Sequence, residues 1–196
     1  NASTVWTATG TKLTPTTPVT LSWANGQGQT FRLEYSIDAQ YLITAKQSVA
    51  NNGTAPINVS SFAMIDRFGK PTDPHEADSW TIHVGPTGYL DGKSIFDVDY
   101  EDLDEAGQNN VTYKSAAWLG FTDKYWLAAV IPAKGERVNA AISSPANNMY
   151  QTLFARDFTA VEPGKQITST SRIFSGAKEV QTLSRYEEEQ GITRLS

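Results

Sequence analysis

Residues 118–132 read WLGFTDKYWLAAVIP, and the rest of the chain is interpreted from this stretch. The charged pair Asp123-Lys124 marks a turn, and the apolar run 125–131 follows it without a polar interruption. A half-buried strand would alternate apolar and polar residues, so the run predicts a strand buried on both faces. Pro132 ends the run, because proline has no N–H to donate to a ladder. The chain is therefore expected to fold around a β-sheet with 125–131 as a central strand.

Segments on either side of this stretch also have the pattern of strands. The turn residues Asn-Gly-Gln-Gly at 25–28 and Asn-Asn-Gly at 51–53 predict hairpins, because they tolerate positive φ. The early strands are expected to form an antiparallel meander, and 111–117 to pair with the 118–132 hairpin. Residues 70–94, rich in Pro and Gly, predict an irregular excursion with one short strand. The predicted strands are Val5–Leu13, Val19–Trp23, Phe31–Ile37, Tyr41–Val49, Ile57–Arg67, Trp80–Val84, Val111–Ala117, Gln151–Phe158 and Ile167–Ser175.

The end of the chain has a different period. Val180, Leu183 and Tyr186 recur at helical spacing, and Gly191 stands just beyond the last turn. A helix this short is marginal alone, so it is expected to dock on the sheet. The predicted organisation is an all-β domain over 1–175, followed by an amphipathic helix over 176–196.

Length, charge and cysteine content exclude several classes of protein. A chain of 196 residues suits one all-β domain, and its net charge of −5 argues against a nucleic-acid-binding protein. Cysteine is absent, which excludes disulfides, thiolate metal sites and thiol nucleophiles. No run of about 18 apolar residues is present, so this fragment is expected to be soluble. The missing initiator Met indicates a piece of a longer protein.

Six carboxylates lie close together over residues 97–105, and calcium is one ligand that they could bind. Asp97, Asp99 and Glu101 place oxygen ligands at every second position. The EF-hand pattern nevertheless fails, because Asp102 stands where that loop requires Gly and Gln108 where it requires Glu. A solvated loop beside a strand is the favoured interpretation.

Other candidate sites are weaker still. His75 and His83 could join neighbouring acids in a metal site or in proton transfer, but their spacing favours neither over a structural role. No nucleophile elbow, phosphate loop or dinucleotide fingerprint is present. We therefore expect no enzyme activity, no cofactor and no metal site. Five tryptophans could line a sugar cleft, although aromatic residues on alternating strands more often belong to the core: Trp6, Trp23, Trp80, Trp118 and Trp126.

Four segments, in order, resemble the periplasmic domain of the YidC family of bacterial membrane-protein insertases. They are PVTLSWANGQG at 18–28, IDRFG at 65–69, WLGFTDKYWLAAVIP at 118–132 and FSGAKEV at 174–180. The similarity spans nearly the whole chain, is most specific at 118–132, and is alphaproteobacterial in character. The resemblance implies an all-β, antiparallel β-supersandwich like that of galactose mutarotase, with a short C-terminal α-helix that begins the linker to a transmembrane segment. The insertase chemistry of the family belongs to its membrane part, so no catalytic residue is carried over to this chain.

The resemblance also implies a function, partners and a location. The chain is expected to be a non-catalytic domain on the periplasmic side of the bacterial inner membrane, in an insertase and chaperone that helps inner-membrane proteins to insert and fold. Through the full-length, membrane-tethered protein its partners would be Sec translocon components and nascent membrane proteins. The expected contact surfaces are the 70–94 excursion, the acidic loop 97–105 and the helix 177–195. Their candidate residues are Asp97, Asp99, Glu101, Lys178, Glu179, Arg185 and Glu188.

Two alternatives to this function stay open. A carbohydrate-binding or mutarotase-like module would place exposed aromatic side chains in a cleft, and a structural spacer would only hold the membrane part at a distance. The chain also resembles the family's domain from part-way along it, so the first strands of the supersandwich are expected to be missing. An exposed sheet edge would then allow self-association between chains.

Overall fold

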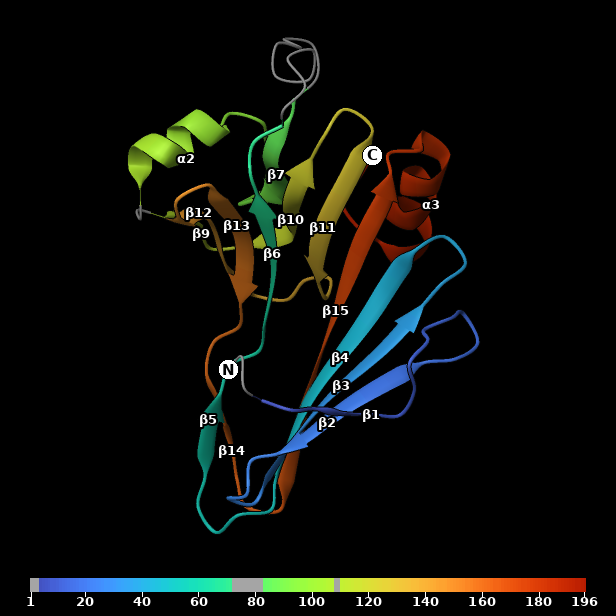
Figure 1. Ribbon diagram of the computed structural model, residues 1–196, viewed down its shortest axis with the longest axis vertical. Helices are drawn as coiled ribbons and strands as arrows, with labels where there is room; N and C mark the ends of the chain where they lie inside the picture. The colour runs from blue at the N-terminus through green and yellow to red at the C-terminus, as the bar shows by residue number, and fades with distance from the viewer. Residues whose placement is uncertain (1–3, 72–82, 108–109) are drawn as a thin grey trace. The chain divides into compact units, whose positions relative to one another are not determined.

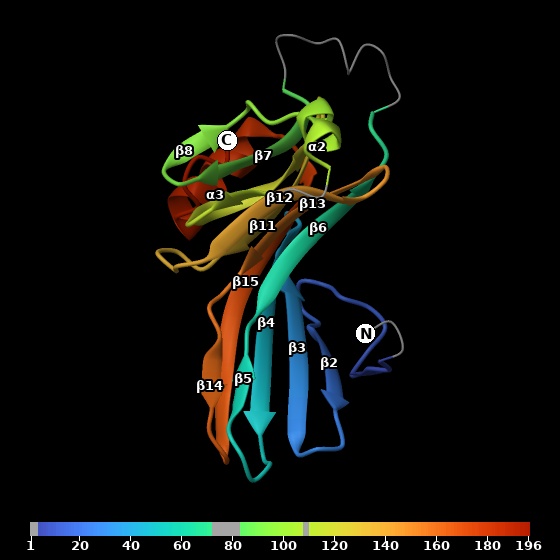
Figure 2. The same ribbon diagram turned by 90° about the vertical axis from the view of Figure 1, so that its left-hand side faces the viewer.

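The computed structural model describes residues 4–71, 83–107 and 110–196. The chain forms two compact units, each made of two separate stretches of sequence. The first unit consists of Asn1–Ser61 with Asp157–Ile173, and the second of Phe62–Arg156 with Phe174–Ser196. Figures 1 and 2 together label the helices and strands of both units.

The first unit is built on an antiparallel sheet with the strand order β1-β2-β3-β4-β15, beside which β5 pairs with β14. Gly26 and Gly28 have φ angles of 75° and 95°, so the predicted tight hairpin between β2 and β3 is confirmed. The predicted meander holds for β2, β3 and β4 and ends there, because β5 pairs with β14 rather than with β4. The strands are β1 (Thr7–Ala8), β2 (Val19–Ala24), β3 (Gln29–Ile37), β4 (Leu42–Asn51), β5 (Ile57–Val59), β14 (Thr159–Val161) and β15 (Lys165–Ala177), which continues into the second unit.

The first unit has a thin apolar core. Trp23 of β2 lies directly opposite Phe31 of the neighbouring β3, and their ring centroids are 5.2 Å apart. Both side chains are nevertheless only half-buried. The buried apolar side chains that the structure describes in this unit are Leu42, Ala45 and Val161.

A polar side chain occupies the centre of the first unit instead. Asn51 is fully buried, and its Nδ2 donates to the carbonyls of Ala55 at 2.9 Å and Val161 at 2.8 Å. Its Oδ1 accepts hydrogen bonds from Gln29 Nε2 at 2.9 Å and from the Gly53 N–H at 3.0 Å. Asn51 therefore joins β3, β14 and the loop after β4.

The second unit contains two sheets and the helices α2 and α3 (Figure 2). One sheet continues from β15 in the order β15-β11-β10-β7-β8, and the other has the order β6-β13-β12-β9. The elements are β6 (Phe62–Phe68), β7 (Gly85–Leu90), β8 (Lys93–Ile95), α2 (Tyr100–Ala106), β9 (Val111–Tyr113), β10 (Ala116–Thr122), β11 (Trp126–Pro132), β12 (Asn139–Ala146), β13 (Met149–Ala155) and α3 (Val180–Gln190).

The central strand predicted from residues 125–131 is confirmed for most of its length. β11 lies between β10 and β15, and Leu127 and Val130 are 3% and 1% exposed. The prediction is wrong for the first two residues, because Tyr125 and Trp126 are 62% and 60% exposed. They lie where the strand leaves the hairpin turn, and there the sheet no longer covers both faces.

The glycines and prolines of residues 70–94 were predicted to interrupt regular structure, and for β7 this prediction is wrong. Gly85, Pro86 and Gly88 lie within β7, which pairs with β10. A Cβ on Gly88 would stand 2.7 Å from the Trp118 carbonyl oxygen, so the glycine permits a close strand approach. Of the short strand predicted at 80–84, residues 80–82 lie outside the described residues, and His83 and Val84 are not in a strand.

The acidic loop is a helix. Asp99 caps α2: its side chain accepts from the Asp102 N–H at 2.8 Å, and Asp102 accepts from the Asp99 N–H at 3.0 Å. This reciprocal pair satisfies N–H groups at the start of the helix. Glu101 and Asp102, which lie in the first turn, also suit the positive end of the helix dipole, so part of the acidic cluster stabilises the start of the helix.

Several strand boundaries differ from the predicted ones. The segment 5–13 contains only the short β1, and 57–67 is two strands, β5 and β6, which belong to different units. The segment 111–117 divides into β9, which pairs with β12, and the start of β10. β12 was not predicted, and β13 ends at Ala155 instead of 158.

The C-terminal helix and the residues after it are held to the second unit. Leu183 and Tyr186 of α3 are buried, and Gly191 ends the helix in the left-handed conformation, as predicted. Trp118 Nε1 donates to the carbonyls of Thr193 and Arg194 at 3.0 and 3.1 Å. No helix among the described residues is long and apolar enough to cross a membrane.

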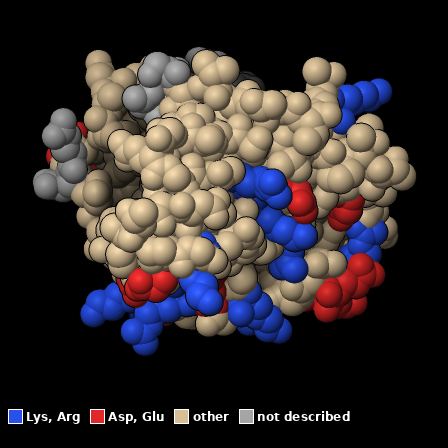
Figure 3. All heavy atoms as spheres, turned by 90° about the horizontal axis from the view of Figure 1, so that it is seen from below, with Lys and Arg blue, Asp and Glu red and all other residues tan. Residues whose placement is uncertain are grey.

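Charged side chains of both signs share the surface. On the face drawn in Figure 3, Lys and Arg side chains lie beside Asp and Glu side chains, with wide uncharged areas between them.

Candidate functional site

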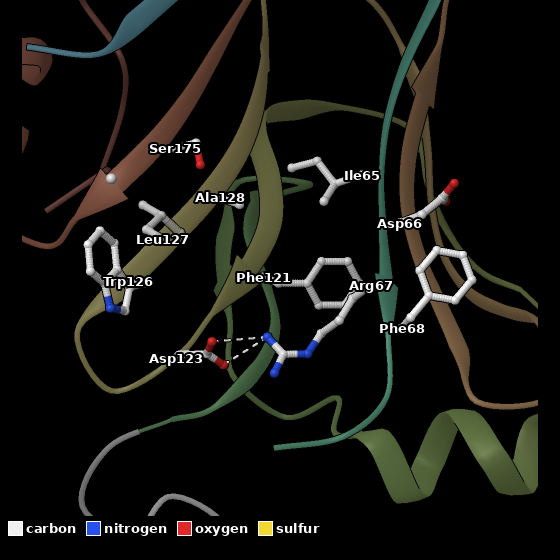
Figure 4. A pocket seen from close by; sticks show the side chains of 11 residues that line it. Ile65, Asp66, Arg67, Phe68, Phe121, Asp123, Trp126, Leu127, Ala128 and Ser175 are labelled. Atoms are coloured by element: carbon white, nitrogen blue, oxygen red, sulfur yellow. Dashed lines mark hydrogen bonds and ion pairs between the residues drawn. The ribbon is translucent and has the colours of Figure 1, made fainter. Parts of the chain in front are cut away.

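A pocket of about 330 Å³ lies within the second unit, between the two sheets. One wall comes from β6 and the other from β10, β11 and the end of β15 (Figure 4). Its lining residues are Ile65, Asp66, Arg67, Phe68, Phe121, Asp123, Trp126, Leu127, Ala128, Ser175 and Gly176. This volume is at the lower end of the range for small-molecule and cofactor pockets, on the order of 300–1,000 Å³.

Alternation along β6 decides which side chains enter the pocket. Ile65 and Arg67 point toward Phe121 and Asp123, whereas Asp66 and Phe68 point to the other face of the strand (Figure 4). This is the period of two that any strand imposes. The IDRFG segment therefore supplies one apolar and one cationic side chain to the interior.

The arginine in the pocket is held by an ion pair. Arg67 Nη1 lies 2.9 and 3.0 Å from the two carboxylate oxygens of Asp123, and Arg67 Nε donates to the Gly69 carbonyl at 3.2 Å. The guanidinium also lies 5.7 Å from the ring centroid of Tyr100. Because the two opposite charges compensate each other, this end of the pocket is polar but close to neutral.

The other acid that lines the pocket is bonded to a neutral group. Asp66 Oδ1 accepts a hydrogen bond from Gln151 Nε2 at 2.8 Å, across the β6–β13 pair. Among the ion pairs of the described residues, none includes Asp66. Within the part of the chain that the structure describes, its carboxylate therefore has a hydrogen-bond donor but no ion-pair partner.

Large apolar side chains lie exposed at the rim. Phe68 is 77% exposed and Trp126 is 60% exposed, although each borders the pocket. Inside, Phe121 and Leu127 are buried. An apolar interior with an exposed aromatic rim can bind a partner by burying its apolar groups, which is the main favourable contribution to most association.

A network of aromatic and charged residues anchors α2 near β13. The ring of Tyr100 packs edge-on against that of Tyr150, with 4.7 Å between the ring centroids. The Tyr150 hydroxyl donates a hydrogen bond to Asp104 Oδ1 at 2.9 Å. Lys70 Nζ lies 2.8 Å from carboxylate oxygens of both Asp104 and Glu101. The hydrogen bond from Lys70 lowers the pKa of Asp104, and the two carboxylates raise the pKa of Lys70.

The tyrosines of this network are kept protonated. Burial raises the pKa of Tyr100, whose hydroxyl has no hydrogen-bond partner among the described residues, and burial together with Asp104 raises the pKa of Tyr150. Both groups therefore stay neutral near pH 7. They stabilise packing rather than supply a base.

The predicted contact residues fall into two separate groups. Asp97 and Asp99 precede α2 and Glu101 lies in it, so this group surrounds the helix that replaced the predicted loop. Lys178 and Glu179 precede α3, and Arg185 and Glu188 lie in it. The two helices lie on opposite sides of the second unit in Figure 1, so the structure does not bring the groups together.

Several of these residues have contacts of their own. Lys178 Nζ donates to Thr122 Oγ1 at 2.9 Å, and burial lowers the pKa of this lysine. Arg185 lies 3.7 Å from Glu189 and over the ring of Tyr186. Glu188 and Asp97 are exposed.

The histidine and metal alternatives gain no support. His83 Nε2 lies 2.7 Å from the Pro86 carbonyl oxygen, and its ring packs edge-on to Phe96. His75 lies outside the described residues. Among the described residues, no group of three or more His, Cys, Asp or Glu side chains could hold a metal ion.

The aromatic residues divide between core and surface. Trp118 is buried, Trp6 and Trp23 are half-buried with rings 6.2 Å apart, and Trp80 lies outside the described residues. Of the four tryptophans that the structure describes, Trp126 alone borders the pocket. The pocket itself was not predicted, although the IDRFG segment and the 118–132 stretch that form most of it had both been singled out.

Comparisons with known proteins agree with the resemblance seen in the sequence. The family model described as YidC periplasmic domain matches residues 1–195. The membrane protein insertase YidC of Bradyrhizobium diazoefficiens is 41% identical over 184 residues, which are 91% of this chain and 29% of the relative. The corresponding insertase of Zymomonas mobilis is 36% identical over 191 residues, 96% of this chain and 32% of the relative. The chain thus spans about a third of the length of these curated relatives.

Solved structures confirm the predicted fold class. A galactose mutarotase-like protein from Lactobacillus casei has a TM-score of 0.61 at 8% identity, with 87% of this chain and 73% of that chain covered. A galactose mutarotase related enzyme from Lactobacillus acidophilus has a TM-score of 0.54 at 12% identity, covering 87% and 71%. At such low identity the likeness shows the fold alone, and fold does not carry function.

Proposed function

The chain belongs to the family of YidC periplasmic domains, and from this premise we propose that it is a non-catalytic accessory domain of a membrane-protein insertase. It acts through protein contacts on the periplasmic side of the inner membrane. Its partners are membrane proteins in the course of insertion and components of the Sec translocon.

The observation that carries this proposal is the family membership, since the relatives are named membrane protein insertases. The chemistry of the pocket supports a binding role. Asp123 is paired with Arg67, and Asp66 is bonded to Gln151, so neither acid is arranged as a general base beside a nucleophile. The exposed Phe68 and Trp126 are available for contact with a partner.

Helix α3 offers a second contact surface. Its buried Leu183 and Tyr186 fix it to the unit, and the Trp118 hydrogen bonds hold the residues that follow it. Glu179 and Glu188 are exposed. A helix held rigidly in this way presents its polar side chains in a fixed arrangement, which lowers the entropy lost on binding.

The test uses a full-length insertase that carries this domain. Two single variants are compared, Glu188→Lys in α3 and Asp97→Lys before α2. Each should leave the melting temperature of the domain unchanged. We expect one of the two reversals to reduce cross-linking to a Sec component, because charges at the rim of an interface mainly change its association rate. If removal of the whole domain changes neither cross-linking nor insertion of a model substrate, the proposal is wrong and the structural spacer is favoured.

The exposed indole of Trp126 favours a second candidate, a carbohydrate-binding module. Sugars stack on exposed aromatic rings, and the Arg67–Asp123 pair could bond their hydroxyl groups. Titration with a panel of monosaccharides, followed by tryptophan fluorescence, tests this directly. A saturable change at millimolar concentration or below that disappears in Trp126→Leu would support the second candidate over the first.

A further inference from the structure

The free edge of β6 borders the pocket. Among the described residues β6 is the outermost strand of its sheet, with β13 on its one paired side. Four consecutive residues of β6, from Ile65 to Phe68, line the pocket. Consecutive side chains of a strand point to opposite faces, so one pocket can touch four in a row only along the strand's edge.

The register with β13 shows which backbone groups face this edge. The Gly69 N–H donates to the Asn148 carbonyl at 2.9 Å, one position beyond the last strand pair. In an antiparallel ladder every second residue bonds to the neighbouring strand, so the residues between them direct N–H and C=O the other way. These are Met64, Asp66 and Phe68. Their backbone groups therefore face the pocket's open side.

We propose that the free edge of β6 binds an extended polypeptide segment as an added strand, with a basic residue opposite Asp66 and apolar residues on both sides of it entering the pocket. The proposal deepens the proposed function, on which it rests, by stating the chemistry of the segment that the domain contacts. Strand addition obtains its affinity from backbone hydrogen bonds and its selectivity from pockets for alternate side chains.

The outer face of β6 is unusually apolar for an edge strand. Phe62, Met64 and Phe68 are 50%, 45% and 77% exposed. Natural edge strands are commonly protected by charges, prolines or bulges, and a long apolar edge is a template for pairing with another chain. Here the single charge in that row is Asp66.

Asp66 selects the residue opposite it. Directly opposite residues of an added strand have their side chains on the same face, so the residue paired with Asp66 would lie beside its carboxylate. Gln151, which bonds that carboxylate, is neutral, and none of the ion pairs among the described residues includes Asp66. A lysine or arginine at this position of the partner supplies the missing charge.

The pocket selects the residues before and after that cation. Their side chains point to the inner face, where Ile65, Phe121 and Leu127 form an apolar interior. Arg67 and Asp123 compensate each other at its end, so a further charge would enter without a counter-ion. Apolar side chains therefore fit there better than charged ones.

A second copy of the chain fits this edge less well. Pairing two β6 strands about a two-fold axis would bring with the partner its own β10, β11 and β15, which flank β6 on the pocket side. A lone extended segment needs only the edge and the pocket. Self-association is therefore an outcome that the test must distinguish.

The test measures binding of a synthetic peptide to the 196-residue chain by amide chemical shifts and by isothermal titration. The probe is an extended heptapeptide of alternating Thr and Val with a central Lys that has Val on both sides. Two further probes carry one N-methyl group each, at the central Lys or at the Val that follows it. We expect methylation at Lys to abolish binding, because in a strand added antiparallel to β6 this N–H donates to the Asp66 carbonyl. Methylation at Val should leave the affinity within about twofold, because that N–H points away from β6.

A charge exchange tests the role of Asp66. Asp66→Lys should weaken binding of the Lys peptide about fivefold or more, and a peptide with Glu in place of Lys should bind that variant better than it binds the unchanged chain. Arg32→Glu, a charge reversal on an exposed position of β3 in the other unit, is the matched control and should change neither affinity.

Four outcomes would overturn the inference. They are no binding of the Lys peptide, equal loss of binding for the two methylated peptides, no effect of Asp66→Lys, and a concentration-dependent dimer in ultracentrifugation that Asp66→Lys abolishes. The proposed function fails separately, when the domain is dispensable for insertion and cross-linking although the peptide binds as expected.

Discussion

Asn51 shows how much one residue can hold together without taking part in a binding site. In the sequence it belongs to an Asn-Asn-Gly turn, and its turn chemistry predicted a hairpin from β4 to the next strand. The chain does turn there, but β5 pairs with β14 instead. Local turn chemistry cannot reveal the partner, because the Val161 carbonyl that Asn51 bonds is 110 residues away.

The first prediction concerns this side chain. Asn51→Ala should lower the free energy of unfolding by about 3 kcal/mol, because it leaves the buried Gln29 amide and the buried Val161 carbonyl without these partners. Urea denaturation followed by circular dichroism measures the change. Asn58→Ala, at an exposed position of β5, is the control and should cost less than about 0.5 kcal/mol. Equal effects of the two substitutions would contradict the central role of Asn51.

The second prediction concerns Lys70 and the carboxylate of Asp104. The folded pKa of Asp104 is lowered, so its contribution is present above the ordinary carboxyl pKa and is lost as pH falls through the folded value. The pKa of Lys70 is raised, so its contribution is present below the ordinary lysine pKa and is lost as pH rises through the folded value. The pair therefore stabilises the protein over the broad neutral range between these limits.

Lys70→Met should lower stability by less than about 1 kcal/mol at pH 7, because both side chains are more than a third exposed. The difference from the unchanged chain should shrink toward about pH 3, where unfolded carboxyls are protonated. Thermal denaturation at a series of pH values checks this, with Lys46→Met as the comparison because Lys46 pairs with the single acid Glu34. A difference that grows on acidification would contradict the argument.

Whether a strand could be predicted from the sequence depended more on how its residues are buried than on their intrinsic strand propensity. The unbroken apolar run at 125–131 identified β11, which spans 126–132, because a strand covered on both faces has no polar position. β12 was missed because Asn139–Ala146 is rich in Ala and Ser, and its burial depends on β13 and β9 beside it. β7 was missed because Gly and Pro read as breaks, whereas close approach to β10 requires its glycine.

The third prediction tests β11 as the central strand. Val130→Asp should unfold the second unit or cost more than about 4 kcal/mol, because the strand is covered by β10, β15 and the opposite sheet, and a buried charge would have no partner. Trp126→Ser, four residues earlier in the same strand, should cost less than about 1 kcal/mol because this side chain is 60% exposed. Near-ultraviolet circular dichroism and urea titration distinguish the two. A folded Val130→Asp variant would show that the strand is not central.

The fourth prediction concerns the pairing of β10 with β11. A Cβ on Gly120 would collide with the Ala128 carbonyl oxygen, and this backbone atom cannot rotate away as a side chain could. Gly120→Ala should therefore cost about 1–3 kcal/mol, the usual cost of overpacking, although alanine is the smallest side chain. Gly135→Ala, in a turn with open space around it but a φ of 75°, isolates the effect of backbone strain alone. If the Gly120 variant were as stable as the unchanged chain, the close approach of these strands would be wrong.

At the scale of the whole molecule, the pocket could not be predicted although its parts could. It gathers residues from 65–68, 121–128 and 175–176, and nothing in the sequence states that these three stretches meet. The resemblance predicted the fold class and family correctly, because both are properties of the whole chain. The division into two units arises from segments that leave one unit and return to it, at Ser61–Phe62, Arg156–Asp157 and Ile173–Phe174. The predicted boundary at 175–176 concerns a different division and stays a prediction.

The two units should differ in local stability, because their buried apolar content differs. In the first unit the described buried apolar side chains are Leu42, Ala45 and Val161, whereas the second contains large ones such as Trp118, Phe154 and Phe174. Apolar burial is the dominant favourable contribution to folding, and local opening free energies follow it.

The fifth prediction is that native-state hydrogen exchange will show two levels of protection. Amides of β10 and β11 should exchange only at the global free energy of unfolding, and those of β2, β3 and β4 at a lower one. Asn51→Ala should speed exchange in β2–β4 without changing β10 and β11, since its hydrogen bonds lie within the first unit. Val130→Ala should speed exchange in β10 and β11 without changing β2–β4, because it opens a cavity in the second unit. If both substitutions speed exchange equally throughout the chain, the two units unfold as one cooperative body, and the thin apolar core of the first unit does not set its stability.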